Sequence, residues 1–365
     1  MNARLTELHK SMGAQMEEFG GFVLPSVYSS IENEYSMARR SAVFFDLSHF
    51  GRLRLKGKDS ADLLNRLVTN DLRGMRPGMG KQAFFTTEKG RVIDLCTIYV
   101  MSESILVLTS PGNSENVKKW IEKFIVNEDV LVEDVTLSFP MFYIAGTYAA
   151  NFVKEMAHSS YKSFLDVSRM PKSNFIRTFL GGIHVFLSRS DMIMKNGYLM
   201  TVDSSNAEEV WNNLNRAASK FGAAPAGIST FEILRVENGT PVYPYELNDN
   251  AFPPELNVFD AISFTKGCYV GQEVISRMQV HDKVRRRLVG FVSATKVPRG
   301  SKIFSANSLE TEAGVVTSSV KSPGLNNHLS LAFVTVQKFL SGESFFANAG
   351  NKNIEMQIST LPFIV

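Results

Sequence analysis

The sequence predicts an α+β protein that ends in a small antiparallel β-barrel. Two patterns predict this fold class. Between residues 41 and 125, apolar segments with strand-like and helix-like periodicity follow one another in turn. After residue 285, the apolar segments become short and are separated by glycine and proline turns. Several short strands with such turns are typical of a barrel.

The first elements follow from periodicity in chain order. Residues 4–40 are helical in part, because apolar side chains recur there at helical spacing. Residues 42–57 alternate between apolar and polar side chains, which indicates a strand. Residues 58–72 predict an amphipathic helix that Asp59 or Ser60 can cap.

Three strands and a helix come next. Residues 81–101 predict two strands joined by a turn at Glu88–Gly90. Residues 104–110 predict a further, buried strand, and residues 111–125 predict a helix. Strands and helices therefore alternate throughout this part of the chain.

The second half is less regular. Strands are expected near 139–145 and 183–188, and helices over 206–222 and 229–239. Residues 240–257 carry four prolines, and long irregular segments in compact domains are often functional.

The change of pattern near residue 285 suggests a domain boundary. We expect one region over residues 1–284, formed by two intertwined α+β subdomains, and a separate small β-barrel over residues 285–365.

Composition narrows the class of protein. The chain has 365 residues, 44% of them hydrophobic, which is enough for buried cores in two or three domains. A net charge of +3 gives no argument for a nucleic-acid partner. The first twenty residues are not expected to be a signal peptide, and no run of about 18 apolar residues predicts a membrane helix. The two cysteines suggest neither a disulfide framework nor a metal site, so we expect a reducing cytoplasm.

The strongest candidate for chemistry is Cys268, in the stretch SFTKGCYVGQEVISRM at 263–278. It lies just ahead of an expected helix start, where the helix dipole and the charge of Lys266 would both favour a thiolate. Gly267 and Gly271 permit a tight turn. The residues alone equally allow a packed cysteine that only fills this turn.

Three other features have both a functional and a structural interpretation. Asp94 lies in an otherwise apolar strand, so it either belongs to a polar site or caps a nearby turn. Aromatic side chains such as Phe85 could line a pocket for a planar ligand or simply pack in the core. The basic run KVRRR at 283–287 is either a solvated face or a docking site for an anionic partner.

Several sequence blocks, in order, resemble those of the glycine cleavage T-protein superfamily (GcvT), the folate-binding aminomethyltransferases and their YgfZ-type relatives. The resemblance covers nearly the whole chain. Its blocks are FGGFVLPSVYSS, FFDLSHFGRLRLKG, LVTNDL, PGMGKQAFFTTEKGRVIDL, GNSENVKKWI, PAGISTFEILRVENGTPVYPYEL, PPELNVFDAISFTKGCYVGQEV and AGVVTSSVKSPGLNNHLSLAFV, with a terminal LPF. The string KGCYVGQE matches the YgfZ signature KGCYxGQE.

The resemblance implies a three-part, disc-like GcvT/YgfZ-type fold with a central folate channel. It implies tetrahydrofolate or a derivative as cofactor, no resident metal, and an aminomethyltransferase-like folate-binding region over residues 1–284. The residues that match folate-binding positions of the family are Phe50, Phe84, Asp94, Tyr99, Asn113, Arg235 and Glu237. The signature residues are Lys266, Gly267, Cys268, Tyr269, Gly271, Gln272 and Glu273.

The sequence also departs from the T-protein pattern. Where T-proteins carry two successive aspartates, this chain has Asp94 followed by Leu95, so the carboxylate near the reacting folate nitrogens is missing. Leu199 replaces a family glutamate that helps to hold the pterin. The arginine that often follows the terminal LPFY is absent after LPFIV.

The resemblance and these departures predict a tetrahydrofolate-binding accessory factor for the assembly or repair of iron–sulfur proteins. Cys268 is its candidate functional thiol, and Asp94 is a second candidate catalytic residue. Expected partners are folate and iron–sulfur client or assembly proteins, with no membrane or nucleic-acid partner. The alternatives are a folate-dependent aminomethyltransferase of the T-protein type and a scaffold that docks an acidic partner or RNA through the KVRRR run.

Overall fold

A computed structural model describes residues 3–157, 167–280, 284–305, 308–337, 344–350 and 352–364. The chain forms two compact units, each discontinuous in sequence. Unit 1 comprises Met1–Asn65, Leu72–Ala83 and Cys96–Phe231. Unit 2 comprises Arg66–Asp71, Phe84–Leu95 and Glu232–Val365. No helix of the described residues is long and apolar enough to cross a membrane.

Unit 1 contains a six-stranded sheet in the order β10-β11-β12-β9-β3-β13. Its strands are antiparallel except for the short parallel pair of β13 with β3. The bounds are β3 Val43–Asp46, β9 Met141–Ala145, β10 Phe175–Leu180, β11 Ile183–Ser190, β12 Gly197–Thr201 and β13 Ala224–Pro225. Residues far apart in sequence thus form a single sheet.

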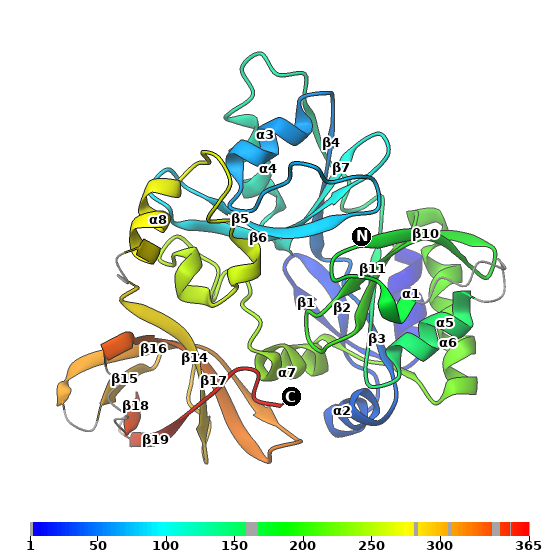
Figure 1. The fold of residues 1–365 in the computed structure, drawn as a ribbon. Helices are drawn as coiled ribbons and strands as arrows, with labels where there is room; N and C mark the ends of the chain where they lie inside the picture. The colour runs from blue at the N-terminus through cyan, green and yellow to red at the C-terminus, as the bar shows by residue number, and fades with distance from the viewer. Residues whose placement is uncertain are drawn as a thin grey trace. The chain divides into compact units, whose positions relative to one another are not determined.

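Helices α1 (Ala3–Ser11), α5 (Ala149–Ala157) and α6 (Ala207–Phe221) lie together beside this sheet (Figure 1). Their apolar side chains form one core with those of the strands. In α6 the fully buried Trp211 packs its ring edge-on against Phe44, with ring centroids 5.0 Å apart. The helix ends at Gly222, whose left-handed φ of 64° suits glycine.

A second, five-stranded sheet has the order β5-β6-β7-β4-β8. Its strands are β4 Phe50–Lys56, β5 Gly80–Thr86, β6 Val92–Val100, β7 Ile105–Pro111 and β8 Leu131–Asp134. Strands β5 and β6, like helix α7 (Ile228–Asn238), run from one unit into the other. Unit 1 also contains the hairpin β1 Gln15–Phe19 and β2 Phe22–Val27, the helices α2 Ile31–Arg40 and α4 Ser114–Glu122, and most of α3 Ser60–Leu67.

Unit 2 contains a closed barrel in the order β14-β17-β16-β15-β18-β19. The strands are β14 Arg286–Ser293, β15 Lys302–Ser305, β16 Ser308–Ser322, β17 Asn327–Thr335, β18 Phe345–Ala349 and β19 Lys352–Ser359. Strand β17 is apolar on both faces. Its Ala332 and Val334 belong to the barrel core, whereas Leu329 and Leu331 belong to a second core with Val236 of α7.

The predicted α+β fold with a C-terminal antiparallel barrel is confirmed. The sequence did not predict the hairpin β1–β2 or strands β8, β10 and β12. The expected boundary at 284/285 lies just before β14, and the division into two linear domains stays a prediction. Lys283 of the basic run lies outside the described residues, and Arg286 of the same run pairs with Glu255 at 3.1 Å.

His49, which directly precedes β4, should make the stability of the protein depend on pH. It is buried, and burial lowers its pKa to about 4. Between this value and the unfolded pKa of about 6.5, the unfolded chain binds a proton that the folded protein does not bind. Stability should therefore fall by about 2 kcal/mol from pH 7 to pH 5.

Urea denaturation at the two pH values tests this prediction. His49→Gln should flatten the pH dependence, and replacing the exposed His184 with glutamine should leave it unchanged. An equal slope in the wild type and in His49→Gln would assign the pH dependence to other groups.

Candidate functional site

The residues that sequence predicts for the site fall into both units. Phe50, Tyr99 and Asn113 belong to unit 1. Unit 2 contains Phe84, Asp94, Arg235, Glu237 and all residues of the KGCYVGQE string.

Tyr99 of β6 lies in an aromatic environment. Its ring meets Phe175 and Phe186 edge-on, with ring centroids 5.8 and 5.6 Å apart. Its hydroxyl accepts a hydrogen bond of 3.1 Å from the Ser188 hydroxyl. Burial raises the pKa of Tyr99 to about 12, so this side chain is neutral at physiological pH.

Phe50 and Asn113 are buried at the ends of strands in unit 1. The ring of Phe50, which begins β4, lies 6.4 Å from that of Phe231. Asn113 precedes helix α4, and its side-chain oxygen accepts a hydrogen bond of 2.9 Å from Asn116. Both residues are therefore held in place by neighbours within the same unit.

Alternation along β6 separates the candidate residues of this strand. Asp94 is fully buried and shares its strand face with Cys96 and Ile98. Leu95 shares the opposite face with Tyr99, and it packs against the core that contains Phe84. Leu95, where the resemblance predicts a carboxylate in T-proteins, thus lies on the strand face of Tyr99. The predicted role of Asp94 remains a prediction.

Arg235 of α7 is completely buried, and protein acceptors take all five of its N–H groups. Its Nε and one Nη2 hydrogen bind Glu232, and its second Nη2 hydrogen donates to the Ser318 hydroxyl at 2.8 Å. Its Nη1 donates to the carbonyl of Thr240 at 2.9 Å and to Glu246 at 3.3 Å.

This network fixes the charge of Arg235. Burial alone lowers the pKa of Arg235, but the carboxylates of Glu232 and Glu246 more than reverse this, so its pKa is raised. Glu246 is itself fully buried and accepts a second hydrogen bond from Ser318 at 2.7 Å. The sequence did not single out Glu246 or Ser318. Glu246 lies in the four-proline segment 240–257, whose irregular sequence could have pointed to it. Folate binding by Arg235 stays a prediction.

Glu237, two residues further along α7, is also buried. It accepts a hydrogen bond from the Ser322 hydroxyl of β16, and its backbone carbonyl accepts one of 2.8 Å from Phe363. Within unit 2 it connects α7 to the end of β16 and to the C-terminal segment.

The residues Lys266–Glu273, which we call the signature loop, are joined to segment Arg66–Asp71 by several hydrogen bonds. The Lys266 ammonium is buried and donates to the carbonyls of Val68 at 2.9 Å and Asn70 at 2.6 Å. The backbone N–H of Val270 donates to the carbonyl of Arg66 at 2.9 Å. The sequence block LVTNDL thus provides the acceptors for the signature lysine.

The end of β5 and the turn that follows it contact Val270 and Gly271 of the signature loop. The Thr86 hydroxyl donates to the carbonyl of Val270 at 2.7 Å. Gly271 has a φ of 83°, and a Cβ added there would lie 2.6 Å from the carbonyl oxygen of Thr87. Only glycine fits this position, after which α8 (Gln272–Val280) begins.

Cys268 is exposed, as are Gly267 and Glu273 of the same loop. The two cysteines of the chain are both free, with Cys96 buried in β6 and Cys268 exposed. The Lys266 ammonium lies over the ring of the buried Tyr269, 5.3 Å from its centroid, and bonds to backbone carbonyls. The signature loop thus buries its lysine and tyrosine and presents its thiol to solvent.

This exposure predicts selective chemical modification. Iodoacetamide should alkylate Cys268 in the native protein and spare Cys96, because alkylation requires access to the sulfur. Mass spectrometry of the intact protein should show one adduct under native conditions and two in denaturant. Two adducts in the native protein, or alkylation of Cys96 first, would contradict this assignment.

Comparisons with known proteins agree with the fold. Residues 5–266 match the GCVT N-terminal domain, and residues 286–364 match the glycine cleavage T-protein C-terminal barrel domain. The chain is similar to a protein named aminomethyltransferase from Halothermothrix orenii, with 26% identity over 99% of both chains. It is also similar to one from Bacillus pumilus, with 27% identity over 98% of this chain and 97% of the relative.

A solved structure has the same fold. The crystal structure of glycine cleavage system aminomethyltransferase T from Bartonella henselae superimposes with a TM-score of 0.86 at 18% identity, over 99% of this chain and 97% of that one. GcvT aminomethyltransferases use tetrahydrofolate, the cofactor that the sequence predicts. From the two domain matches, which together span most of its length, the chain belongs to the glycine cleavage T-protein (GcvT) family.

Proposed function

We propose that this chain is a tetrahydrofolate-binding accessory factor for the assembly or repair of iron–sulfur proteins, of the YgfZ type, with Cys268 as its functional thiol. One observation carries the proposal. The signature loop is held by buried hydrogen bonds of Lys266 and by the glycine-only turn at Gly271, yet its cysteine is exposed. A cysteine that only filled the turn would be packed against these neighbours.

The residues fit folate binding better than aminomethyl transfer. Neutral aromatic side chains such as Tyr99 suit a planar ring. Leu95, on the same strand face as Tyr99, cannot stabilise positive charge on a reacting nitrogen. Losing such a group typically costs about 10²–10³-fold in rate.

Complementation tests the role of the thiol. A strain that lacks its own YgfZ-type factor should recover the activity of its iron–sulfur enzymes with the wild-type chain, but not with Cys268→Ser. Thr265→Ala is the matched control, because Thr265 is exposed in the segment just before the signature loop. If Cys268→Ser complements as well as the wild type, the thiol has no functional role.

A second candidate function is aminomethyl transfer. The observation that favours it is the similarity, over almost the full length, to proteins named aminomethyltransferase. Purified protein should be incubated with tetrahydrofolate and an aminomethyl-lipoyl donor protein. We expect no methylene-tetrahydrofolate above the background, and turnover at rates typical of an enzyme would favour this second function instead.

The proposed role also suggests a compartment and partners. An exposed free thiol at Cys268 persists best in a reducing environment, so we propose the cytoplasm. The proposed partners are iron–sulfur client or assembly proteins. Co-purification of the wild type, but not of Cys268→Ser, with such a protein would support this.

A further inference from the structure

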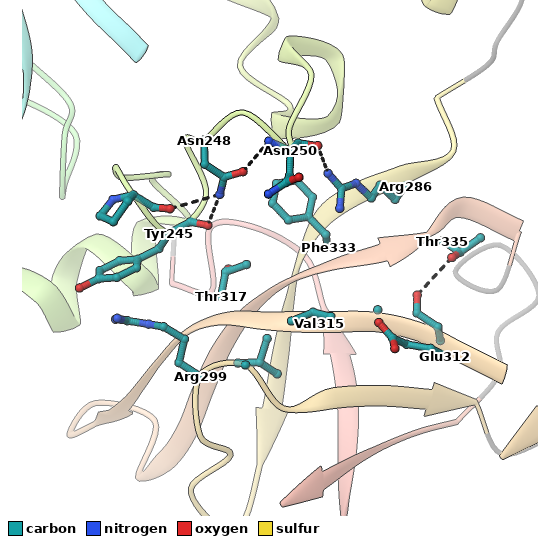
Figure 2. A pocket seen from close by; sticks show the side chains of 15 residues that line it. Tyr245, Asn248, Asn250, Arg286, Arg299, Glu312, Val315, Thr317, Phe333 and Thr335 are labelled. Atoms are coloured by element: carbon teal, nitrogen blue, oxygen red, sulfur yellow. Dashed lines mark hydrogen bonds between the residues drawn. The ribbon is translucent and has the colours of Figure 1, made fainter. Parts of the chain in front are cut away.

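Unit 2 contains a groove of about 550 Å³ on the outer side of the barrel. Its floor includes strand β16 from Glu312 to Thr317, and one wall is formed by residues of the irregular segment 244–250 (Figure 2). None of the residues predicted to bind folate lines it. Cavities of this volume accommodate small-molecule ligands.

Arg299 is the distinctive residue of this groove. Its guanidinium lies on the ring of Tyr245, 3.2 Å from the ring centroid. Arg299 is exposed, and among the described residues no carboxylate pairs with it. Stacking fixes the plane of the guanidinium and leaves its N–H edges available, which is the geometry that binds a carboxylate through two hydrogen bonds.

The other charged side chains of the groove are already paired. Arg286 donates to Glu255 through Nε and Nη2, at 3.1 and 3.2 Å, and its guanidinium lies 4.5 Å from the centroid of the Phe333 ring. Glu312 pairs with Lys302 at 3.1 Å. Arg299 is therefore the uncompensated charge of the lining, and it selects for an anion.

The wall beside Tyr245 is fixed by its own hydrogen bonds. The side-chain amide of Asn248 donates to the carbonyls of Pro244 and Tyr245, at 3.2 and 2.9 Å. Its oxygen accepts the backbone N–H of Asn250 at 2.9 Å, and the carbonyl of Asn250 accepts from Arg286. The groove is thus formed before any ligand arrives, which lowers the entropic cost of binding.

The floor offers acceptors and apolar surface. A β-bulge at Thr317 interrupts the pairing of β16 with β17. The hydroxyls of Thr317 and Thr335 donate to the carbonyls of Leu331 and Ala313, so their remaining lone pairs can accept hydrogen bonds. Val315 lies between the Arg299 end and the Thr335 end of the groove (Figure 2).

We infer that this groove binds an organic carboxylate, with the carboxylate on Arg299 and an amide-bearing, partly apolar body along β16. Thr317 and Thr335 accept hydrogen bonds from N–H groups of the ligand, and Val315 contacts its apolar part. One uncompensated guanidinium matches a single carboxylate, whereas a phosphate of higher charge recruits several cations or backbone N–H groups.

Hippurate is a suitable probe because it carries a carboxylate, one amide N–H and a phenyl ring. Isothermal titration and NMR should show binding to the wild-type chain. Arg299→Gln should weaken it about 10- to 100-fold, the effect expected for a lost charged hydrogen bond. The matched control is Arg277→Gln on α8. Arg277 is also exposed and lies outside the groove lining, so this variant should bind hippurate like the wild type.

Several results would overturn the inference. These include no binding of hippurate at 10 mM, equal binding of neutral hippuramide, and equal binding by Arg299→Gln. Tighter binding of phenyl phosphate than of hippurate would show that the groove prefers a phosphate to a carboxylate, which would contradict the inference. Tetrahydrofolate should not displace hippurate, and displacement would make the groove part of the folate site.

The source of the carboxylate can be distinguished in the same experiment. A decapeptide ending in Phe-Gly with a free C-terminus presents the same chemistry as hippurate on a polypeptide. Comparable affinity for the peptide would identify a protein tail as the natural ligand, and binding of hippurate alone would identify a free metabolite. Both results support a carboxylate site at Arg299.

Discussion

Replacing Arg235 with methionine is expected to destabilise unit 2 by about 3–5 kcal/mol, the usual cost of breaking a buried ion pair by removing one partner. The side chain of Glu246 is completely buried, so without Arg235 it would keep an uncompensated charge. Ser318 would lose a hydrogen-bond partner at the same time. Urea denaturation followed by circular dichroism would measure the change in the free energy of unfolding.

Two further variants make this prediction specific. Arg277→Ala removes an ion pair with Glu273 whose side chains are 71% and 75% exposed, and it should cost less than about 1 kcal/mol. The double variant Arg235→Met/Glu246→Leu should recover part of the lost stability, because it removes both buried charges. A loss below about 1 kcal/mol for Arg235→Met alone would show that the network contributes little.

Replacing Gly271 with alanine is the second change with a large expected effect. Its φ of 83° is costly for a residue with a Cβ, by about 1–2 kcal/mol. The new methyl group would also lie 2.6 Å from the carbonyl oxygen of Thr87 and 2.8 Å from the Thr86 hydroxyl. Moving this backbone adds about 1–3 kcal/mol, so the total loss should be about 2–5 kcal/mol.

Gly300 provides the matched control for Gly271. It belongs to the same unit and has a nearly equal φ of 81°, but among the described residues beyond its chain neighbours no atom lies within 4 Å of an added Cβ. Gly300→Ala should therefore show the conformational cost alone, about 1–2 kcal/mol. Equal losses for the two variants would mean that the close approach of the signature loop to Thr87 does not contribute.

Much of the fold could be predicted because its information is local. The short apolar runs of β14 and β17 and the helical period of α6 depend only on neighbouring residues. The short strands β10 and β12 were missed because their apolar residues lack a clear period of their own. They form strands because both of them pair with β11 in the sheet.

The candidate site was less predictable. The family resemblance implies that Arg235 is a folate ligand. It could not show that Ser318, 83 residues away, takes one of the hydrogen bonds of Arg235. Alternation along β6 was readable from the sequence, and it places Asp94 and Tyr99 on opposite faces of the strand. The family resemblance nevertheless implies the same ligand for both of them.

The sequence by itself determined the family and the α+β class with its barrel. It determined that Cys268 lies before a helix, but not whether its sulfur is packed or free. Tertiary structure decided that question, because the partners of Lys266 lie almost 200 residues away, at Val68 and Asn70. Exposure depends on such distant contacts, and no local pattern of residues contains them.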